Sequence, residues 1–215
     1  MKNQIDMSKF EKIIGVIILS TFILKLALVP GASTFLVFFF IFLILSYTFF
    51  GFVILNQIHI KNLFKKESFR DISALRLVGT ILLGCVFAIF CMGCLFKIQH
   101  WPGAMALPYI AFILAIIPLV LILLKYFKTK NIFYLNTLKR FVIISCFSLI
   151  FFTIPELTFI KIEFRNHPGY IKAFEEYQKK PFDKETHKVL EYEYNKAVLS
   201  KDDFKKFEEY TKSNK

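Results

Sequence analysis

Two of the four cysteines and the four histidines are the side chains that could hold a metal ion or act as a nucleophile or base. Cys91 and Cys94 have the C-x-x-C spacing of metal and redox sites. No second pair accompanies them, and they lie in an apolar run, where cysteine behaves as a small hydrophobic residue. The histidines are dispersed, and no catalytic motif surrounds them: His59, His100, His167 and His187. The pattern predicts no catalytic, cofactor or metal site, and leaves open a role for His100 as proton carrier or ligand.

Ionisable side chains inside apolar runs could serve transport or proton transfer, because they are costly in a membrane and are kept there mainly for function. Two such residues occur, Lys25 and Glu156. Both lie near the ends of their runs, where a long side chain can extend to the polar interface. The sequence therefore favours a protein without transport or catalytic chemistry.

Five apolar runs are the elements that position these side chains. Hydrophobic residues make up 56% of the 215 positions, and the mean hydropathy of +0.54 is typical of a membrane protein. Each run has roughly the 20 residues that a helix needs to cross a hydrocarbon core. The runs are residues 13–29, 34–55, 77–96, 105–124 and 141–160. We expect an all-α membrane protein with five transmembrane helices. Cleavage of the first run as a signal peptide is an alternative, which Lys25 and the missing hydrophilic mature start disfavour.

The basic residues predict the orientation. A formal net charge of +12 would suit a nucleic-acid partner. The lysines and arginines of the first 160 positions lie between apolar runs, however, so no nucleic-acid partner is expected. Thirteen of them lie in the N-terminus and in the second and fourth connections, against one, Lys97, in the two opposite turns. By the loop-charge rule the N-terminus lies in the cytoplasm. Five crossings then place the C-terminal tail outside, although Lys161, Arg165 and Lys172 beside the last run count against this.

A repeated turn joins the first run to the second and the third run to the fourth. Both copies have a lysine, four further residues and Pro-Gly-Ala: Lys25, Pro30, Gly31 and Ala32, and again Lys97, Pro102, Gly103 and Ala104. The lysine amine is expected to extend to the interface, Pro and Gly to make the turn, and Ala to let the next helix start close by. His100 and Trp101 add interfacial anchoring in the second copy. We interpret the copies as two hairpins that form a parallel repeat.

Small residues and prolines indicate how the third and fourth runs pack. Thr80, Gly84 and Ala88 recur at steps of four, so they share one helix face that a second helix can approach closely. The general frequency of glycine in membrane helices is an alternative explanation. Pro108 and Pro118 predict that the fourth run is a bent helix packed against its neighbours.

The composition changes after residue 160. Residues 161–215 carry 13 basic and 11 acidic side chains, with three apolar rhythms separated by Pro181, by the expected helix cap Asp183 and by Ser200. The rhythms are Ile171, Phe174 and Tyr177; Val189, Leu190 and Ala197; and Phe204, Phe207 and Tyr210. The prediction is a transmembrane domain at residues 1–160 and a small soluble tail of two or three amphipathic helices at residues 161–215.

The second copy of the turn resembles a known sequence. Phe96-Lys97-Ile98-Gln99-His100-Trp101-Pro102-Gly103-Ala104 is similar to the turn in the N-terminal membrane hairpin of the L subunit of the gliding-motility and type IX secretion motor of Bacteroidota, and to related membrane proteins of those bacteria. The resemblance covers residues 77–124. It implies a Gram-negative inner membrane, and hence a periplasmic tail. In that motor subunit a carboxylate in the helix after the turn is implicated in using the proton gradient, whereas residues 110–117 of this chain contain no acid.

These patterns favour a non-catalytic multi-pass inner-membrane protein that acts as a scaffold or interaction partner in the cell envelope. Its expected partners are the lipid bilayer and a protein bound through the tail; the oligomeric state is not indicated. The alternatives are an accessory subunit of a secretion or gliding motor or other proton-driven complex, and a small transporter or membrane enzyme. The tail's aromatic face is either its contact surface or, as the pattern favours, its own core: Phe174, Tyr177, Phe204 and Phe207.

Overall fold

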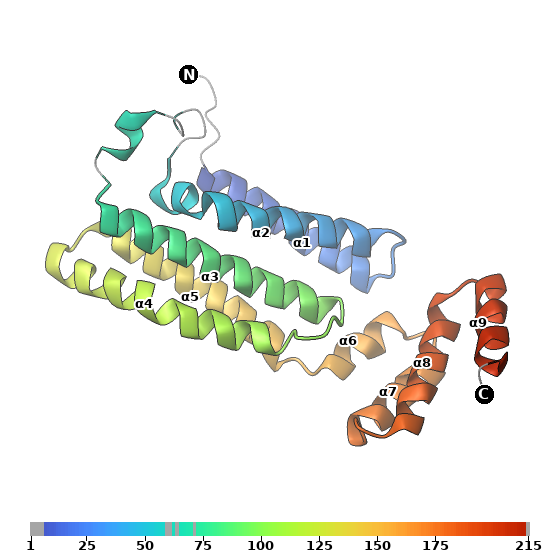
Figure 1. The fold of residues 1–215 in the computed structure, drawn as a ribbon. Coiled ribbons are helices and arrows are strands. Elements are labelled where there is room, and N and C mark those ends of the chain that lie inside the picture. Colours follow the sequence, from blue (N-terminus) through green and yellow to red (C-terminus); the bar gives the residue numbers. More distant parts are fainter. Residues whose placement is uncertain (1–6, 59–61, 63–64, 71, 214–215) are drawn as a thin grey trace. The chain divides into compact units, whose positions relative to one another are not determined.

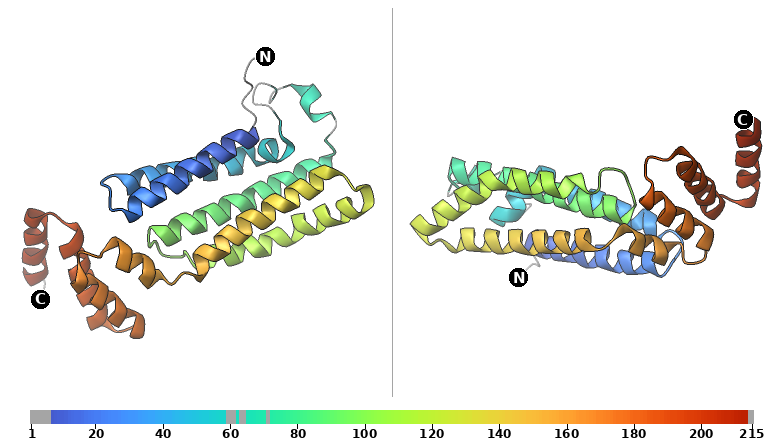
Figure 2. Two further views of the ribbon diagram at one scale, coloured as in Figure 1. Left: turned by 180° about the vertical axis from the view of Figure 1, so that it is seen from behind. Right: turned by 90° about the horizontal axis from the view of Figure 1, so that it is seen from below.

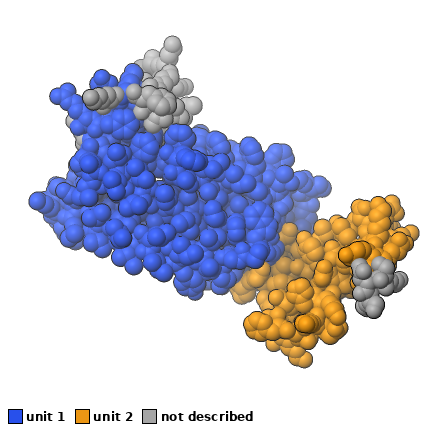
Figure 3. Space-filling model, in the orientation of Figure 1, with its two compact units in different colours: residues 1–154 blue, residues 155–215 orange. Residues whose placement is uncertain are grey.

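The computed structural model describes residues 7–58, 62, 65–70 and 72–213, and within them the regular elements are all helices (Figure 1). The predicted all-α class is confirmed for these residues. The chain divides into two compact units, residues 1–154 and residues 155–215, coloured separately in Figure 3. Four of the histidines and basic residues counted from the sequence lie outside the described ones: Lys2, His59, Lys61 and Lys215.

Five long helices run alongside one another in the first unit (Figures 1 and 2). They are α1 (Met7–Leu26), α2 (Ala32–Asn56), α3 (Ala74–Ile98), α4 (Ala106–Thr129) and α5 (Ile132–Thr153), with the short 3-10 helix η2 (Lys66–Phe69) between α2 and α3. α3 packs against α2, α4 and α5, while α1 packs against α2. Because α3 is covered on three sides, its Phe87 and Phe90 side chains are among the most buried in the chain.

Four of these helices, α2 to α5, are long and apolar enough to cross a membrane, which marks the chain as a multi-pass membrane protein. Large apolar side chains cover their outer surface, as contact with lipid requires; Phe38, Ile113 and Ile143 are each more than 60% exposed. α1 is not among the four, because charged side chains interrupt its apolar sequence: Lys9, Glu11, Lys12 and Lys25. Four of the five predicted spans are thus confirmed.

The polar connection expected at residues 125–140 is helical instead. α4 continues to Thr129 and α5 begins at Ile132. Asn131 caps α5, since its side-chain Oδ1 accepts a hydrogen bond from the backbone N–H of Phe133 at 2.9 Å. The prediction was wrong here because lysine and arginine are good helix formers. Their charge indicates where the apolar core ends, not where the helix ends.

The last long helix ends before residue 160, where the sequence had placed its end. Ile154 is extended, with φ −69° and ψ 122°, because a following proline disfavours the helical conformation. The short helix α6 (Glu156–Glu163) then begins after Pro155. Glu156 therefore belongs to α6, and the first compact unit ends at residue 154.

The fourth run accommodates its prolines in different ways. Pro108 lies in the first turn of α4, where the missing backbone N–H would have no partner within the helix. Pro118 lies inside α4 and its side chain is fully buried. The helix at Pro118 is thus packed against its neighbours, as expected of a proline inside a membrane helix.

The second unit has a small core of its own, made by α6, α7 (Pro168–Lys179) and α8 (Lys184–Val198), and α9 (Lys201–Ser213) packs on α8. The expected cap of α8 forms, because the Asp183 side chain accepts a hydrogen bond from the backbone N–H of Thr186 at 3.2 Å. The core residues are Ile160, Tyr170 and Phe174, with Leu190 and Ala197 of α8 packed against them. Burial raises the pKa of Tyr170 to about 12, so this phenol is neutral at physiological pH.

Candidate functional site

The two copies of the repeated turn have the same backbone conformation. Leu28 and His100 occupy equivalent positions and have left-handed φ angles of 60° and 56°. Gly31 and Gly103, three residues later, have φ angles of 81° and 86°. A left-handed conformation costs a residue with a side chain about 1–2 kcal/mol, whereas glycine adopts it readily. The turn therefore needs its glycine for conformation.

Matching hydrogen bonds close the two turns. The backbone N–H of Val29 donates to the Leu24 carbonyl at 3.1 Å, and that of Trp101 donates to the Phe96 carbonyl at 2.9 Å. A bond across six residues with a left-handed residue inside it is the Schellman motif, which satisfies carbonyl groups at a helix C-terminus. The sequence repeat thus corresponds to one turn structure used twice.

The two repeated lysines differ in their partners. Lys25 is 6% exposed, and its Nζ donates a hydrogen bond to the Ile98 carbonyl at 2.7 Å. Lys97 is 5% exposed, and its Nζ lies 3.6 Å from Met105 Sδ and 6.0 Å from the centroid of the Phe152 ring. Both amines are buried within the protein, rather than extended to the interface as expected. The reason for Lys25 is that Ile98 is in the last turn of α3, whose carbonyls have no partner within the helix and attract a cation.

A second hydrogen bond joins the two turns. The Ser33 hydroxyl at the start of α2 donates to Gln99 Oε1 at 2.9 Å. The Gln99 Nε2 is buried and has no hydrogen-bond partner within the described residues. Around this junction Ala32 is 4% exposed, whereas the Trp101 ring is 41% exposed and meets the Phe96 ring edge to face at 5.2 Å. Of the remaining turn residues, Pro30 and Pro102 are exposed and Ala104 is half-buried.

The small residues of α3 face α2. A Cβ atom at Gly84 would lie 2.7 Å from the Tyr47 carbonyl oxygen and 2.9 Å from the Gly51 Cα. Thr80 and Ala88 are buried, and the Thr80 hydroxyl accepts a hydrogen bond from Asn56 Nδ2 at 3.0 Å. The stripe thus lies where α2 and α3 come closest.

A cluster that the sequence argument missed joins α1, α2 and α5. The Glu11 carboxylate accepts a hydrogen bond from the Tyr47 hydroxyl and lies 3.4 Å from Arg140 Nη1. Arg140 Nη1 also donates to the Ile54 carbonyl at 3.2 Å. Both charged side chains are mostly covered, at 20% exposure for Glu11 and 19% for Arg140. The pair was missed because Glu11 falls in the expected polar N-terminus and Arg140 in an expected connection, so neither was placed on a helix. The helical period that places Glu11 on one face with Gly15, Ile18 and Phe22 is the signal that would have found it.

A cavity of 420 Å³ lies between α1, α2, α3 and α5. Glu11 and Tyr47 contribute its polar lining together with Ser148, and most of its wall is apolar. Cys91 and Cys94 both face it, and Cys94 Sγ lies 3.9 Å from Ser148 Oγ. In the described part of the chain, no group of three or more His, Cys, Asp or Glu side chains could hold a metal ion. The cavity suits a hydrocarbon chain. The one carboxylate in its wall is that of Glu11, which is already paired with Arg140.

No family model matches this chain, and no curated protein or solved structure matches it either.

Proposed function

We propose that the chain is a non-catalytic multi-pass protein of a bacterial inner membrane that holds a partner protein of the cell envelope through α9. The observation that supports this most is the apolar face of α9, where Phe204, Phe207 and Tyr210 recur at steps of three. Phe204 packs on α8, with its ring 5.4 Å from that of Tyr192. Phe207 is half-buried and Tyr210 is 70% exposed. The apolar face thus extends beyond the part that α8 covers.

Site-specific photo-crosslinking in cells tests this proposal. A photoreactive phenylalanine analogue at Tyr210 is expected to form an adduct with one protein, because the ring would lie in the contact. The matched control is the same analogue at Lys205, an exposed residue on the opposite face of α9, which is expected to give no such adduct. Equal adducts from both positions, or none from Tyr210, would contradict a contact through this face.

Alanine at Phe207 separates a contact residue from a core residue. If Phe207 is a contact residue, Phe207→Ala removes the adduct at Tyr210 while the second unit stays folded and protected from protease. If Phe207 is a core residue, Phe207→Ala also makes the second unit accessible to protease. The Phe207 ring is half-buried, so part of its surface is open to a partner.

The same proposal includes five crossings, with the N-terminus in the cytoplasm and the tail in the periplasm. Two observations support α1 as the fifth span. Its hairpin with α2 ends in the same turn as the hairpin of α3 and α4, as a parallel repeat requires. Its outward side chains are apolar, since Ile13, Val16 and Ile23 are all more than half exposed.

Cysteine accessibility in intact cells tests this topology. In a variant without the native cysteines, Ser200→Cys is expected to react with a membrane-impermeant reagent and Ser68→Cys is not. Reaction at position 68 alone would invert the orientation. Reaction at both positions would mean an even number of crossings between residues 68 and 200, which would contradict the three assigned to α3, α4 and α5.

An accessory role in a proton-driven complex is the second candidate, and the covered Glu11 carboxylate is the observation that favours it. The purified chain in liposomes, under an imposed membrane potential, would then conduct protons across the membrane. A pH-sensitive dye inside the liposomes would report this proton flux. Glu11→Asp, which keeps the carboxyl group, would retain the flux and Glu11→Gln would lose it. An unchanged flux in Glu11→Gln would leave Glu11 a structural partner of Arg140.

A further inference from the structure

A polar pocket of 160 Å³ lies where α2 ends and where α3 and α5 begin. Six polar side chains line it: Asn56, Gln57, Arg76, Asn136, Thr137 and Arg140. Its described lining contains two guanidinium groups and no carboxylate. Glu11 pairs with Arg140 from outside this lining, so the positive charge of the pocket comes mainly from Arg76. A small cationic pocket of this kind favours an anion that accepts several hydrogen bonds.

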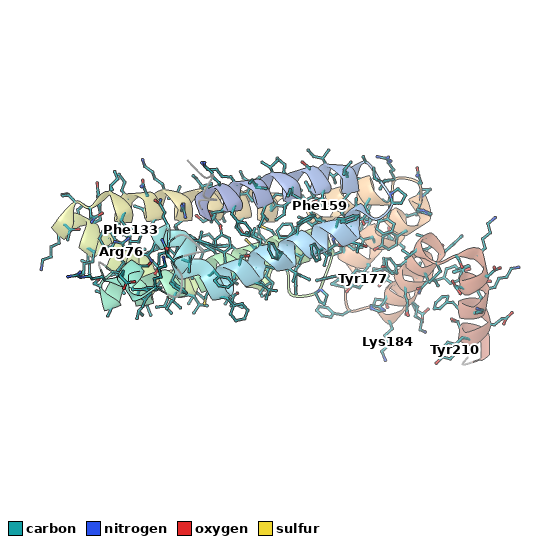
Figure 4. The ribbon with its side chains drawn as sticks, turned by 90° about the horizontal axis from the view of Figure 1, so that it is seen from above. Arg76, Phe133, Phe159, Tyr177, Lys184 and Tyr210 are labelled. Carbon is teal, nitrogen blue, oxygen red and sulfur yellow. The ribbon has the colours of Figure 1, made fainter. Side chains whose placement is uncertain are left out.

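Arg76 is held from two directions. Its Nε donates to Asn56 Oδ1 at 2.7 Å, and its guanidinium carbon lies 3.4 Å from the centroid of the Phe133 ring, beside which Figure 4 shows it. Asn56 is fixed in turn by its bond to the Thr80 hydroxyl. Stacking and hydrogen bonding set the plane of the guanidinium before any ligand arrives, and such preorganisation reduces the entropy cost of binding.

Arg140 approaches the same pocket from α5. In the described part of the chain its contacts with Glu11 and with the Ile54 carbonyl are both made by Nη1. A guanidinium has five N–H donors, so capping α2 and pairing with Glu11 occupy a minority of them. The two arginines come from helices far apart in sequence, and the fold brings both to one pocket.

We propose that this pocket binds a phosphate group, with the headgroup of an anionic phospholipid as its source. The guanidinium fork matches phosphate oxygens in a bidentate geometry. The pocket lies at helix ends, the depth at which lipid headgroups meet the protein, and basic pockets between membrane helices bind anionic headgroups.

Thermal unfolding of the full-length protein in a neutral detergent tests the proposal. Phosphatidylglycerol is expected to raise the melting temperature, because a ligand that binds the folded state stabilises it, and phosphatidylcholine is expected to raise it less. Arg76→Lys keeps the positive charge but loses the bidentate geometry of the guanidinium. The lipid concentration that gives half of the maximal rise in melting temperature should therefore increase about tenfold, as the loss of one charge-assisted hydrogen bond predicts. Lys139→Gln removes a neighbouring exposed charge and should leave that concentration unchanged.

Two further measurements, with inorganic phosphate and with a second pocket variant, distinguish the possible outcomes. Inorganic phosphate, at matched ionic strength against chloride, would reproduce the shift if a free phosphate were the ligand, and that shift too would be lost in Arg76→Lys. If Arg76→Lys lowers the melting temperature in chloride alone, Asn136→Leu replaces it, because this exposed side chain lines the pocket. No shift with either ligand, or equal losses in Lys139→Gln and the pocket variants, would overturn the proposal.

Discussion

At the scale of single residues, the Lys25 amine is the most informative group, because a buried charge is costly unless it is paired or hydrogen-bonded. Its bond to the Ile98 carbonyl links the end of α1 to the end of α3. The carbonyl would otherwise have no partner in its own helix, so the bond satisfies both groups. Lys25 thus joins the two hairpins at their turns.

Replacing Lys25 by methionine keeps the length of the side chain and removes the donor. We expect the free energy of unfolding to fall by about 2 kcal/mol, the contribution of a hydrogen bond to a charged group. Unfolding in mixed micelles by a denaturing detergent would measure it. Lys12→Met, at an exposed position of the same helix, is the control and should change stability little. A loss no larger than that of the control would mean that the amine contributes nothing net.

A second prediction at this scale concerns pH. Lys161 Nζ lies 2.8 Å from Glu175 Oε1, and this hydrogen bond and charge lower the pKa of Glu175 below its ordinary 4.5. A carboxyl whose pKa is lower when folded stabilises the folded state above its unfolded pKa, and that contribution is lost as the pH falls through the folded value. The second unit should therefore lose stability below about pH 4.5, by a small amount because the pair is exposed.

Helix content of the full chain, followed between pH 6 and pH 2, would show this loss. Glu175→Gln should make the decline with pH shallower, because the variant has no proton to bind there. Glu191→Gln, an exposed position on α8, controls for removal of one negative charge. Identical pH profiles for the two variants would argue against a specific role of the Lys161 pair.

At the scale of elements, the approach of α2 to α3 determines how the bundle packs. Gly51 and Gly84 face each other so closely that a Cβ on Gly51 would lie 2.6 Å from the Gly84 Cα. No flexible side chain intervenes, so the backbones themselves would have to separate. Small residues at such a crossing allow close packing where lipid removes the hydrophobic driving force between helices.

Gly84→Ala is therefore expected to destabilise the bundle by about 1–3 kcal/mol, the usual cost of overpacking. Gly79→Ala is the matched control, because it lies in the same helix and a Cβ there meets no atom within 4 Å. That variant should be neutral or slightly stabilising, since alanine is the better helix former. Detergent-induced unfolding of both variants gives the comparison, and equal effects would contradict the close contact.

At the scale of the whole molecule, the chain has a membrane unit and a smaller unit, each with its own buried side chains. In the smaller unit Phe174 is 8% exposed and lies in the core, whereas Phe182 is 98% exposed. This pair of phenylalanines allows the core of the unit to be tested with one chemical change.

Phe174→Ala should destabilise residues 155–215 by about 3–5 kcal/mol, the usual cost of truncating a buried phenylalanine. Limited proteolysis of the full chain in membranes would then cut this unit sooner, while residues 1–154 stay protected. Phe182→Ala should leave the cutting rate unchanged, because its ring contributes no buried surface. Equal rates in the two variants would mean that Phe174 is not part of a core.

The sequence by itself determined the features that depend on composition or on neighbours along the chain. Four of the membrane helices follow from long apolar runs, and the cap at Asp183 follows from the residues beside it, because these signals act over a few residues. The two turns could be recognised as one motif for the same reason. Helix ends were less predictable, since charge at residues 125–140 did not stop α4 and α5 from forming.

Only the tertiary structure decided which distant residues meet. Glu11 pairs with Arg140, Lys25 with the Ile98 carbonyl and Gly51 with Gly84, across separations that no local pattern encodes. The pocket of Arg76 and Arg140 likewise exists because α3 and α5 pack together. The physical reason is that apolar runs specify that helices form and face lipid, whereas their mutual order and rotation depend on the packing of side chains from several helices at once.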